Sequence, residues 1–285
     1  MIYNSYAKIN LFLHVCEKLP NNYHALETCF AFINIYDSLE FQITNYNNII
    51  CDGEFAKNMP QIENNLIYKV WIFLKNKYNI QTNLSIHLIK NLPTGGGLGG
   101  GSSNCATTIL AVNDIFKLNM NINEMIEIAI KFGADVPVLL HQYHNNCCFF
   151  ATGIGEVLKP IYCNGNNHIL LVNPLVHCDT KQIFNQFQQN YSEKIIHTYS
   201  HKNETDFIYF MKLQKNDLTN IAVELEPIIN EVIVALENTN SIFARMSGSG
   251  ATCFAVYNDS KQIAEAEKTI KQLFPNFWIK KTNIK

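Results

Sequence analysis

Six of the chain's thirteen glycines fall in one short stretch, residues 92–104, which reads LPTGGGLGGGSSN. Apolar residues alternate before it over 84–88 and recur at helical spacing after it over 105–116, which predicts the local order strand, loop, helix. Glycine admits positive φ and lets a ligand approach the backbone closely. The N–H groups that open a helix suit an anion such as phosphate. The stretch therefore predicts a cradle for a nucleotide phosphate, in which Ser102 or Ser103 could cap the helix or bind a phosphate oxygen.

Two widespread glycine motifs do not fit this loop. Gly95, Gly97 and Gly100 match the dinucleotide pattern G-x-G-x-x-G, but the acid that this pattern needs after a second strand would be Asp114, which falls inside the predicted helix. The P-loop pattern needs a lysine before its hydroxyl residue, and Gly101 stands there. The remaining pattern, P-x-G-G-G-L-G-G-G-S-S, resembles the ATP loop of the GHMP kinases, the superfamily of galactokinase, homoserine kinase and mevalonate kinase.

Composition limits the class of protein. The 285 residues are 47% hydrophobic, enough for two domains or one large one, and the net charge of −2 gives no support to nucleic-acid or membrane-surface binding. No apolar stretch approaches the ~20 residues that span a bilayer. The nine cysteines are odd in number and form no C-x-x-C pair, which favours reduced thiols. The first residues lead directly into a predicted strand, so we expect no targeting peptide and a soluble, cytoplasmic protein.

Three polar segments each allow a functional and a structural interpretation. Residues 7–15 alternate with period two, which places Lys8 and Asn10 on one strand face, about 6–7 Å apart at their Cα atoms, either as a solvated face or as site residues. Asp135 precedes Val136-Pro137 and could be a helix N-cap or a rigid catalytic base. The turn 247–251, Ser-Gly-Ser-Gly-Ala, could be a tight hairpin or a phosphate contact through Gly248, Ser249 and Gly250.

A metal site is not expected. His141, His144, Cys147 and Cys148 are ligand types, but the spacing runs into a strand in which adjacent cysteines point to opposite faces. The histidines are therefore interpreted as turn residues.

The other elements predict an α+β protein. Asn65 caps a helix over 66–74, and a second helix over about 123–132 ends at Gly133. A link at 159–167 leads to a second half with strand 168–173, helix 181–187, loop 188–205, helix 217–237 interrupted by Pro227, the segment 243–257, helix 261–273 and strand 277–281. This order predicts a sandwich with helices on one face of an antiparallel sheet.

Five segments, in the same order along the chain, resemble one branch of the GHMP kinases, the 4-diphosphocytidyl-2-C-methyl-D-erythritol kinases. They are AKINLFL at 7–13, YH-x-L at 23–26, GGGLGGGSS at 95–103, GADVP at 133–137 and SGSGA at 247–251. The resemblance implies a two-domain GHMP kinase fold. Its N-terminal domain, residues 1–160, would be ribosomal-protein-S5-domain-2-like, and its C-terminal domain, residues 161–285, a ferredoxin-like α/β sandwich.

The resemblance also implies an activity, which is phosphorylation by ATP of the 2-hydroxyl of diphosphocytidyl-methylerythritol in the isoprenoid precursor pathway. Asp135 would take the proton of that hydroxyl, and Lys8 would keep the aspartate ionised and offset phosphoryl charge. The residues implied at ATP are Pro93, Thr94, Gly95, Gly96, Gly97, Leu98, Gly99, Gly100, Gly101, Ser102 and Ser103, with Asn65 near the adenine. Those implied at the cytidyl substrate are Asn10, Tyr23, His24, Thr180 and Phe184, with Tyr23 and Phe184 sandwiching the base.

The class further implies Mg²⁺, although no carboxylate cluster marks its site, and a small-molecule partner with no nucleic acid or membrane. A monomer and a homodimer are both compatible with the sequence. Three departures from the family pattern, Tyr6, Asn22 and Thr94, remove no chemical group. Two alternatives remain at this point: a GHMP kinase for another small alcohol such as mevalonate or homoserine, and an ATP-binding regulator that has lost catalysis.

Overall fold

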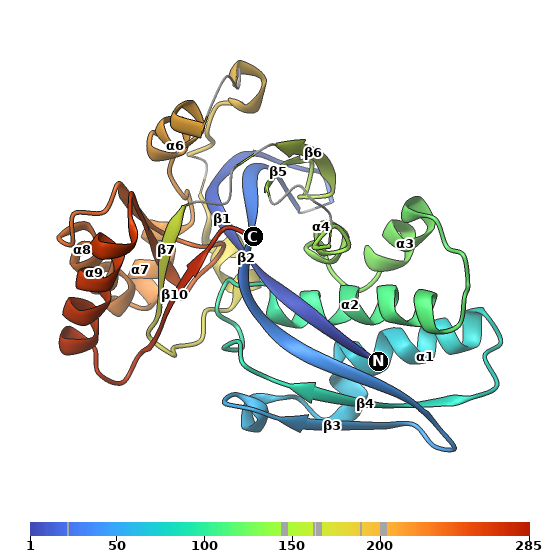
Figure 1. The fold of residues 1–285 in the computed structure, drawn as a ribbon. Helices are drawn as coiled ribbons and strands as arrows, with labels where there is room; N and C mark the ends of the chain where they lie inside the picture. The colour runs from blue at the N-terminus through green and yellow to red at the C-terminus, as the bar shows by residue number, and fades with distance from the viewer. Residues whose placement is uncertain (22, 144–147, 162, 164–166, 189, 200–203) are drawn as a thin grey trace. The chain divides into compact units, whose positions relative to one another are not determined.

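The computed structural model describes residues 1–21, 23–143, 148–161, 163, 167–188, 190–199 and 204–285 (Figure 1). The chain forms two compact units. The first comprises Met1–Ala7, Ile35–Thr94 and Gly99–His144, and the second comprises Lys8–Asn34, Gly95–Leu98 and Asn145–Lys285. Two long paired strands, β1 (Ile2–Lys18) and β2 (His24–Thr44), contribute to both units. Neither unit is thus one continuous stretch of sequence, and a domain boundary at residue 160 stays a prediction.

The first unit combines strands with a helical layer. β4 (Asn83–Ile89) pairs antiparallel with the second half of β2 and parallel with β3 (Asn48–Asp52). Leu84, Ile86 and Leu88 alternate along β4 and are fully buried, as the period-two pattern predicts. Two short 3-10 turns, Ala56–Asn58 and Ile62–Asn64, follow β3.

The helices of this unit pack on one another. α1 (Leu66–Lys77) lies against α2 (Gly100–Ile115), and α2 also contacts α3 (Ile122–Ala129) and α4 (Val136–Leu139) (Figure 1). α2 is buried along most of its length, which fits its many small residues. The loop that precedes α2 is therefore attached to a helix that is buried along most of its length.

The second unit contains an antiparallel sheet in the order β10-β7-β9-β8. Its strands are β7 (His168–Asn173), β8 (Phe243–Met246), β9 (Cys253–Tyr257) and β10 (Trp278–Asn283). The helices α7 (Thr219–Leu225), α8 (Ile228–Glu237) and α9 (Ser260–Leu273) pack against it through one apolar cluster. Ile229, Val232 and Leu236 of α8 enter this cluster at helical spacing. The predicted sandwich of helices on an antiparallel sheet is confirmed.

The rest of the second unit surrounds the first half of β2. β5 (Cys148–Thr152) pairs antiparallel with Thr28–Ala31 of β2 and with β6 (Val157–Ile161). α5 (Thr180–Gln186), a 3-10 turn (Ile196–Thr198) and α6 (Glu204–Lys212) follow β7 along the chain. The C-terminal Ile284 forms a bridge with Ile33, and the Lys285 N–H donates to the Phe32 carbonyl (2.8 Å).

Several local predictions can be compared with these elements. The Asn65 cap is confirmed, because its side chain accepts from the Ile67 N–H (3.0 Å). The expected helix over 217–237 is two helices, with Pro227 at the N-cap of α8. The assignment of Gly133 as the residue that ends its helix is wrong, because α3 ends at Ala129 and turns follow.

Candidate active site

The glycine loop differs from its prediction at the helix start. α2 begins at Gly100 with Gly99, at φ +67°, as its N-cap, so Ser102 and Ser103 lie inside the first turn and the capping interpretation is wrong. No side chain of the described residues caps this helix. The Ser103 N–H donates to the Gly99 carbonyl (2.7 Å), so the N–H groups before it are the ones that can meet an anion.

Residues 95–98 of the loop belong to the second unit and are held there by backbone contacts. The Lys8 N–H donates to the Leu98 carbonyl (3.1 Å), and the Thr252 N–H donates to the Gly96 carbonyl (3.1 Å). Gly97 has a φ of +75°, and a Cβ at this position would lie 2.2 Å from the Ser247 carbonyl oxygen. The close approach therefore requires glycine at 97, and it brings the loop and the turn 247–251 together.

Ser247 joins these two segments to β1. Its hydroxyl donates to the Gly97 carbonyl (3.0 Å) and accepts from the Asn10 N–H (3.0 Å). A Cβ on Gly248 would lie 3.3 Å from the Asn10 Oδ1. Asn10, the loop and the second small-residue turn thus form one compact group of atoms.

Lys8 and Asn10 are not a solvated strand face. They are only 3% and 2% exposed, which overturns that alternative. The Lys8 Nζ donates to the Asn10 Oδ1 (2.6 Å) and lies 5.2 Å from the centroid of the Phe30 ring. Asn10 also donates through Nδ2 to the Thr28 hydroxyl (2.9 Å). The ammonium is therefore held in a fixed position beside the glycine loop.

Asp135, in the first unit, stands at the N-cap position of α4 and is half-buried. Its side chain makes no capping hydrogen bond to that helix, so the structural interpretation of this residue is not supported. The helix itself is set by Val136-Pro137, because proline suits the first turn of a helix.

Two contacts in the second unit involve predicted substrate residues: Thr180 meets Ser249 of the predicted phosphate turn, and His24 meets Phe184. Thr180 and Ser249 share a hydrogen bond between their hydroxyls (2.7 Å). The His24 and Phe184 rings are stacked, with centroids 5.6 Å apart and planes at 27°. Burial, and then the charge of Lys18, lower the pKa of His24, which favours the neutral imidazole. Tyr23 is 55% exposed, and its sandwich with Phe184 stays a prediction.

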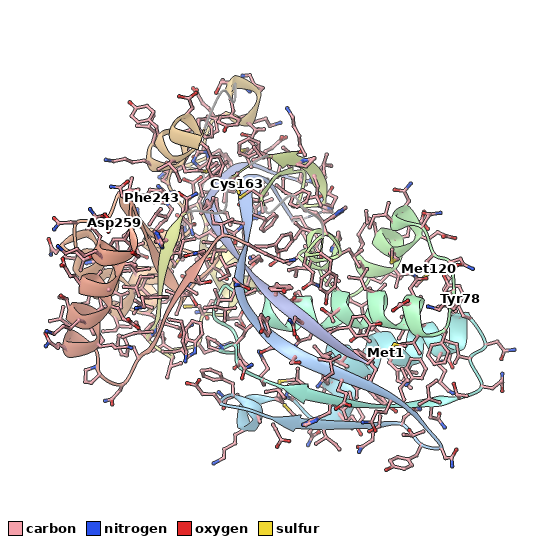
Figure 2. All side chains as sticks on the ribbon, viewed as in Figure 1. Met1, Tyr78, Met120, Cys163, Phe243 and Asp259 are labelled. Atoms are coloured by element: carbon pink, nitrogen blue, oxygen red, sulfur yellow. The ribbon has the colours of Figure 1, made fainter. Side chains whose placement is uncertain are left out.

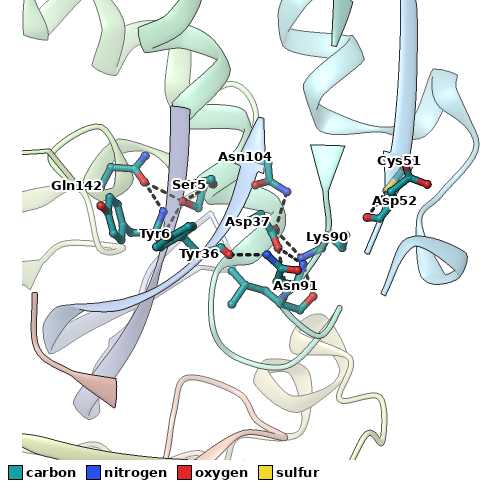
Figure 3. A network of polar contacts seen from close by, with 12 residues as sticks. Ser5, Tyr6, Tyr36, Asp37, Cys51, Asp52, Lys90, Asn91, Asn104 and Gln142 are labelled. Carbon is teal, nitrogen blue, oxygen red and sulfur yellow. Dashed lines mark hydrogen bonds and ion pairs between the residues drawn. The ribbon is translucent and has the colours of Figure 1, made fainter. Parts of the chain in front are cut away.

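The sequence analysis missed a buried ion pair of the first unit (Figure 3). Asp37 and Lys90 are 0% and 1% exposed, and their charged atoms are 2.6 Å apart. The Asp37 carboxylate also accepts from the N–H groups of Asn91 (2.7 Å) and Leu92 (2.9 Å) and from the Asn104 side chain (3.0 Å). The pair therefore joins the segment before the glycine loop to the helix after it.

Lys90 extends this network to the first turn of α2. Its Nζ donates to the Leu92 carbonyl (2.6 Å), and a Cβ on Gly100 would lie 3.2 Å from the same nitrogen. Burial lowers the pKa of Lys90, whereas the charge of Asp37 and its hydrogen bond raise it. The apolar run from Phe30 to Ile43 contains two carboxylates, Asp37 and Glu40, and nothing in their spacing marks Asp37 as the buried one.

Ser103 is also part of a buried network rather than an open hydroxyl. It donates to the Tyr6 carbonyl (2.7 Å) and accepts from the Ser5 hydroxyl (2.8 Å), all within the first unit. Ser102, by contrast, is half-buried.

The described residues contain neither a metal-ligating cluster nor a membrane-spanning helix. Within the described residues, no three His, Cys, Asp or Glu side chains are grouped so that they could hold a metal ion, and His144 and Cys147 lie outside those residues. None of the described helices is long and apolar enough to cross a membrane.

Two protein-family models match this chain. The model for the GHMP kinases N terminal domain matches residues 65–143, and the model for the GHMP kinases C terminal domain matches residues 202–276. The fold is also similar to solved structures below 25% identity, which support the fold alone. One is a 4-(cytidine 5'-diphospho)-2C-methyl-D-erythritol kinase, with a TM-score of 0.78 and 23% identity over 99% of both chains. Another is the homoserine kinase of Cytophaga hutchinsonii, with a TM-score of 0.70, 14% identity and coverage of 98% of this chain and 96% of that one.

The fold, the glycine loop and both family models define a GHMP kinase. Curated relatives narrow the class. The 4-diphosphocytidyl-2-C-methyl-D-erythritol kinase of Francisella philomiragia is 35% identical over 98% of this chain and 95% of its own length. The enzyme of that name from the Wolbachia of Brugia malayi is 33% identical over 96% of this chain and 94% of its own length. The chain belongs to the 4-diphosphocytidyl-2-C-methyl-D-erythritol kinase family.

Proposed function

We propose that this protein transfers the γ-phosphoryl group of ATP to the 2-hydroxyl of 4-diphosphocytidyl-2-C-methyl-D-erythritol, giving the 2-phosphate and ADP in isoprenoid precursor synthesis. The names of the relatives identify this substrate. The observation that carries the proposal is the buried Lys8 ammonium, bonded to Asn10, on a strand whose backbone is bonded to the glycine loop at Leu98.

ATP is bound mainly by the backbone in this proposal. The segment Pro93–Ser102 would surround the phosphates, with the N–H groups that open α2 as donors, and Ser103 would support the turn from inside. The turn Gly248–Gly250 would contribute further contacts, which its closeness to Gly97 supports. Asn65, which caps α1, would lie near the adenine.

Asp135 is the general base in this proposal, and Lys8 is the cation that keeps it ionised and offsets charge on the transferring phosphoryl group. Phosphoryl transfer requires mainly alignment and charge stabilisation, so one base, one lysine and a cradle of N–H groups are sufficient. The position of Asp135 supports this assignment, because a half-buried carboxylate at the start of a proline-containing helix is partly desolvated and held in place.

The cytidyl group would be bound by the residues around the His24–Phe184 stack. A neutral imidazole has one donor and one acceptor, which suits the edge of a cytosine. Tyr23 would close on the base from the exposed side, Thr180 and Phe184 would form the far wall of the cytosine pocket, and Asn10 would lie near the substrate. The stacked aromatic pair supports a planar ligand at this place.

Magnesium enters this proposal as MgATP. In this proposal the ion arrives with the nucleotide phosphates, and among the described residues no His, Cys, Asp or Glu cluster fits a resident metal. The irregular cysteines support action in a reducing cytoplasm. We expect a monomer or a homodimer, with no nucleic-acid or membrane partner.

Release of ADP from MgATP tests the substrate. Purified protein is given diphosphocytidyl-methylerythritol, mevalonate, homoserine or no acceptor in parallel, and release only with the cytidyl substrate is expected. Release with another alcohol would refute the cytosine pocket and keep the kinase. No release from protein that binds ATP would support a regulator instead.

The Asp135→Asn variant tests the base. ATP binding should be kept, and turnover should fall by about 10²–10⁴-fold, the usual contribution of a positioned base. Asp114→Asn is the matched control, because Asp114 is an exposed carboxylate on α2 paired with Lys117. Normal turnover of Asp135→Asn would show that another group takes the proton.

A further inference from the structure

Two buried thiols of the second unit lie almost within bonding distance. Cys148 begins β5, and Cys163 follows the end of β6 by two residues. Cys148 pairs with Ile161, the last residue of β6, so the chain beyond this strand begins next to Cys148. The two Sγ atoms are 2.9 Å apart. This distance exceeds the length of a disulfide bond, about 2.05 Å, by less than about 1 Å.

The surroundings of the pair are apolar and contain a third thiol. Cys148 and Cys163 are 0% and 7% exposed, and Cys163 is labelled in Figure 2. Cys29 is also buried and pairs on β2 with Phe150, the second residue after Cys148. Burial, and then the charges that these thiols and Asp206 would carry, raise the pKa of the nearby Tyr199 hydroxyl, which therefore stays protonated.

This dithiol is connected to the proposed site through one ladder of strand pairs. Cys148 is opposite Ala31 on β2, and the next pair is Phe149 with Phe30. The Phe30 ring is the surface on which the Lys8 ammonium lies, at 5.2 Å. A shift of the backbone at Cys148 would thus reach the position of the ammonium through one neighbouring pair.

We propose that Cys148 and Cys163 are a redox modification site at which a small hydroperoxide forms a reversible disulfide that slows the enzyme. One thiol, as its thiolate, attacks the hydroperoxide O–O bond, which breaks to give a sulfenic acid and water or an alcohol. The second sulfur then attacks the sulfenic sulfur, so the S–S bond forms and the S–O bond breaks. The leaving hydroxide takes the second thiol proton as water. Two thiols and one hydroperoxide thus become a disulfide, water and an alcohol, or two waters from hydrogen peroxide.

The geometry favours the pair over the other thiols. The second step needs a thiol within reach of the sulfenic sulfur, and Cys163 supplies it, because its Sγ lies 2.9 Å from the Cys148 Sγ. In a reducing compartment such a disulfide is transient, because cellular thiols reduce it again. The covalent step does not depend on the proposed function, whereas its effect on turnover rests on it.

The test uses the full chain, reduced and then exposed to hydrogen peroxide, with the remaining thiols alkylated before digestion. We expect a joined peptide pair containing Cys148 and Cys163, a mass lower by two hydrogens, and recovery of the original mass with dithiothreitol. Cys148→Ser and Cys163→Ser should each abolish this product. Cys105→Ser should keep it, since Cys105 is a buried thiol of the first unit.

Turnover is measured on the same samples. Oxidation should lower it at least about threefold in the unmodified protein, dithiothreitol should restore it, and the Cys163→Ser variant should resist the loss. Absence of the 148–163 product in the unmodified protein, or its survival in Cys148→Ser, would overturn the proposed site. The disulfide with unchanged turnover would overturn its link to Lys8. Peptide mass detects the disulfide independently of turnover. A failure of the kinase proposal can therefore be distinguished from a failure of the disulfide proposal.

Discussion

Replacement of Asp37 by asparagine should be one of the most destabilising single changes in the first unit. The carboxylate accepts four hydrogen bonds, from Lys90, Asn91, Leu92 and Asn104, at 2.6–3.0 Å. An amide keeps the shape but removes the charge and replaces one acceptor by a donor. Of the two acceptors that the described residues give the Lys90 ammonium, the Asp37 carboxylate and the Leu92 carbonyl, only the carbonyl would then remain. Breaking a buried pair in this way costs about 3–5 kcal/mol, out of about 5–15 kcal/mol for a whole protein.

The loss should become smaller as pH rises. The charge of Asp37 and its hydrogen bond raise the pKa of Lys90 against the effect of burial, so their removal lowers the pKa of Lys90 in the folded variant. Between that lowered value and the ordinary value of about 10.4, the unfolded variant binds more protons than the folded one. Its stability therefore rises with pH across this window. Relative to the unmodified protein, the rise is confined to pH values below the pKa that Lys90 has in the unmodified fold, which burial already holds under the ordinary value.

Urea unfolding followed by circular dichroism, at pH 7 and at a pH near 9.5, measures both effects. Asp114→Asn is the matched control, because its exposed pair with Lys117 should contribute at most about 1 kcal/mol. The reasoning is refuted if Asp37→Asn loses no more stability than the control at pH 7. It is also refuted if its deficit grows as pH rises.

Three further changes follow from single contacts. Gly97→Ala should weaken ATP binding in calorimetry by about tenfold or more, because its Cβ would meet the Ser247 carbonyl at 2.2 Å; unchanged affinity would contradict the close approach. Asn65→Ala should lower the free energy of unfolding by about 1 kcal/mol through the lost α1 cap, and Asn65→Asp should restore most of it. Arg245→Met should cost about 2–5 kcal/mol in urea unfolding, because the buried guanidinium donates to four backbone carbonyls, and a loss below about 1 kcal/mol would refute this role.

The hydrophobic periodicity of strands and helices made most elements predictable. It did not predict which distant residues bury the faces of those elements. The alternation over 7–15 predicted a strand, yet not that Lys8 and Asn10 are as buried as the apolar face. The residues that bury them include Ser247, which is 237 positions from Asn10, and no local pattern reports such a partner.

Helix boundaries failed where glycine was involved. Glycine is unfavourable inside a helix, so the start of α2 was predicted after Gly101, whereas it begins at Gly100. Tertiary packing contributes to the difference, because a Cβ at Gly100 would meet the Lys90 Nζ at 3.2 Å and the Leu92 side chain at 3.4 Å, which is a tight fit. The Asp37–Lys90 pair was missed for a related reason: single charges beside apolar runs carry no spacing signal.

The division of the chain between its two units sets an order for synthesis. The second unit combines Lys8–Asn34 with Asn145–Lys285, and its sheet is complete only after β10. At about 5–20 residues per second, β10 leaves the ribosome roughly 10 to 50 s after β1. β1 can pair with β2 early, but its Leu13 and Val15 side chains, which pack in the same apolar cluster as Ile279 of β10, lack that partner until then. A nascent chain of this design is a natural client for chaperones that act at the ribosomal exit.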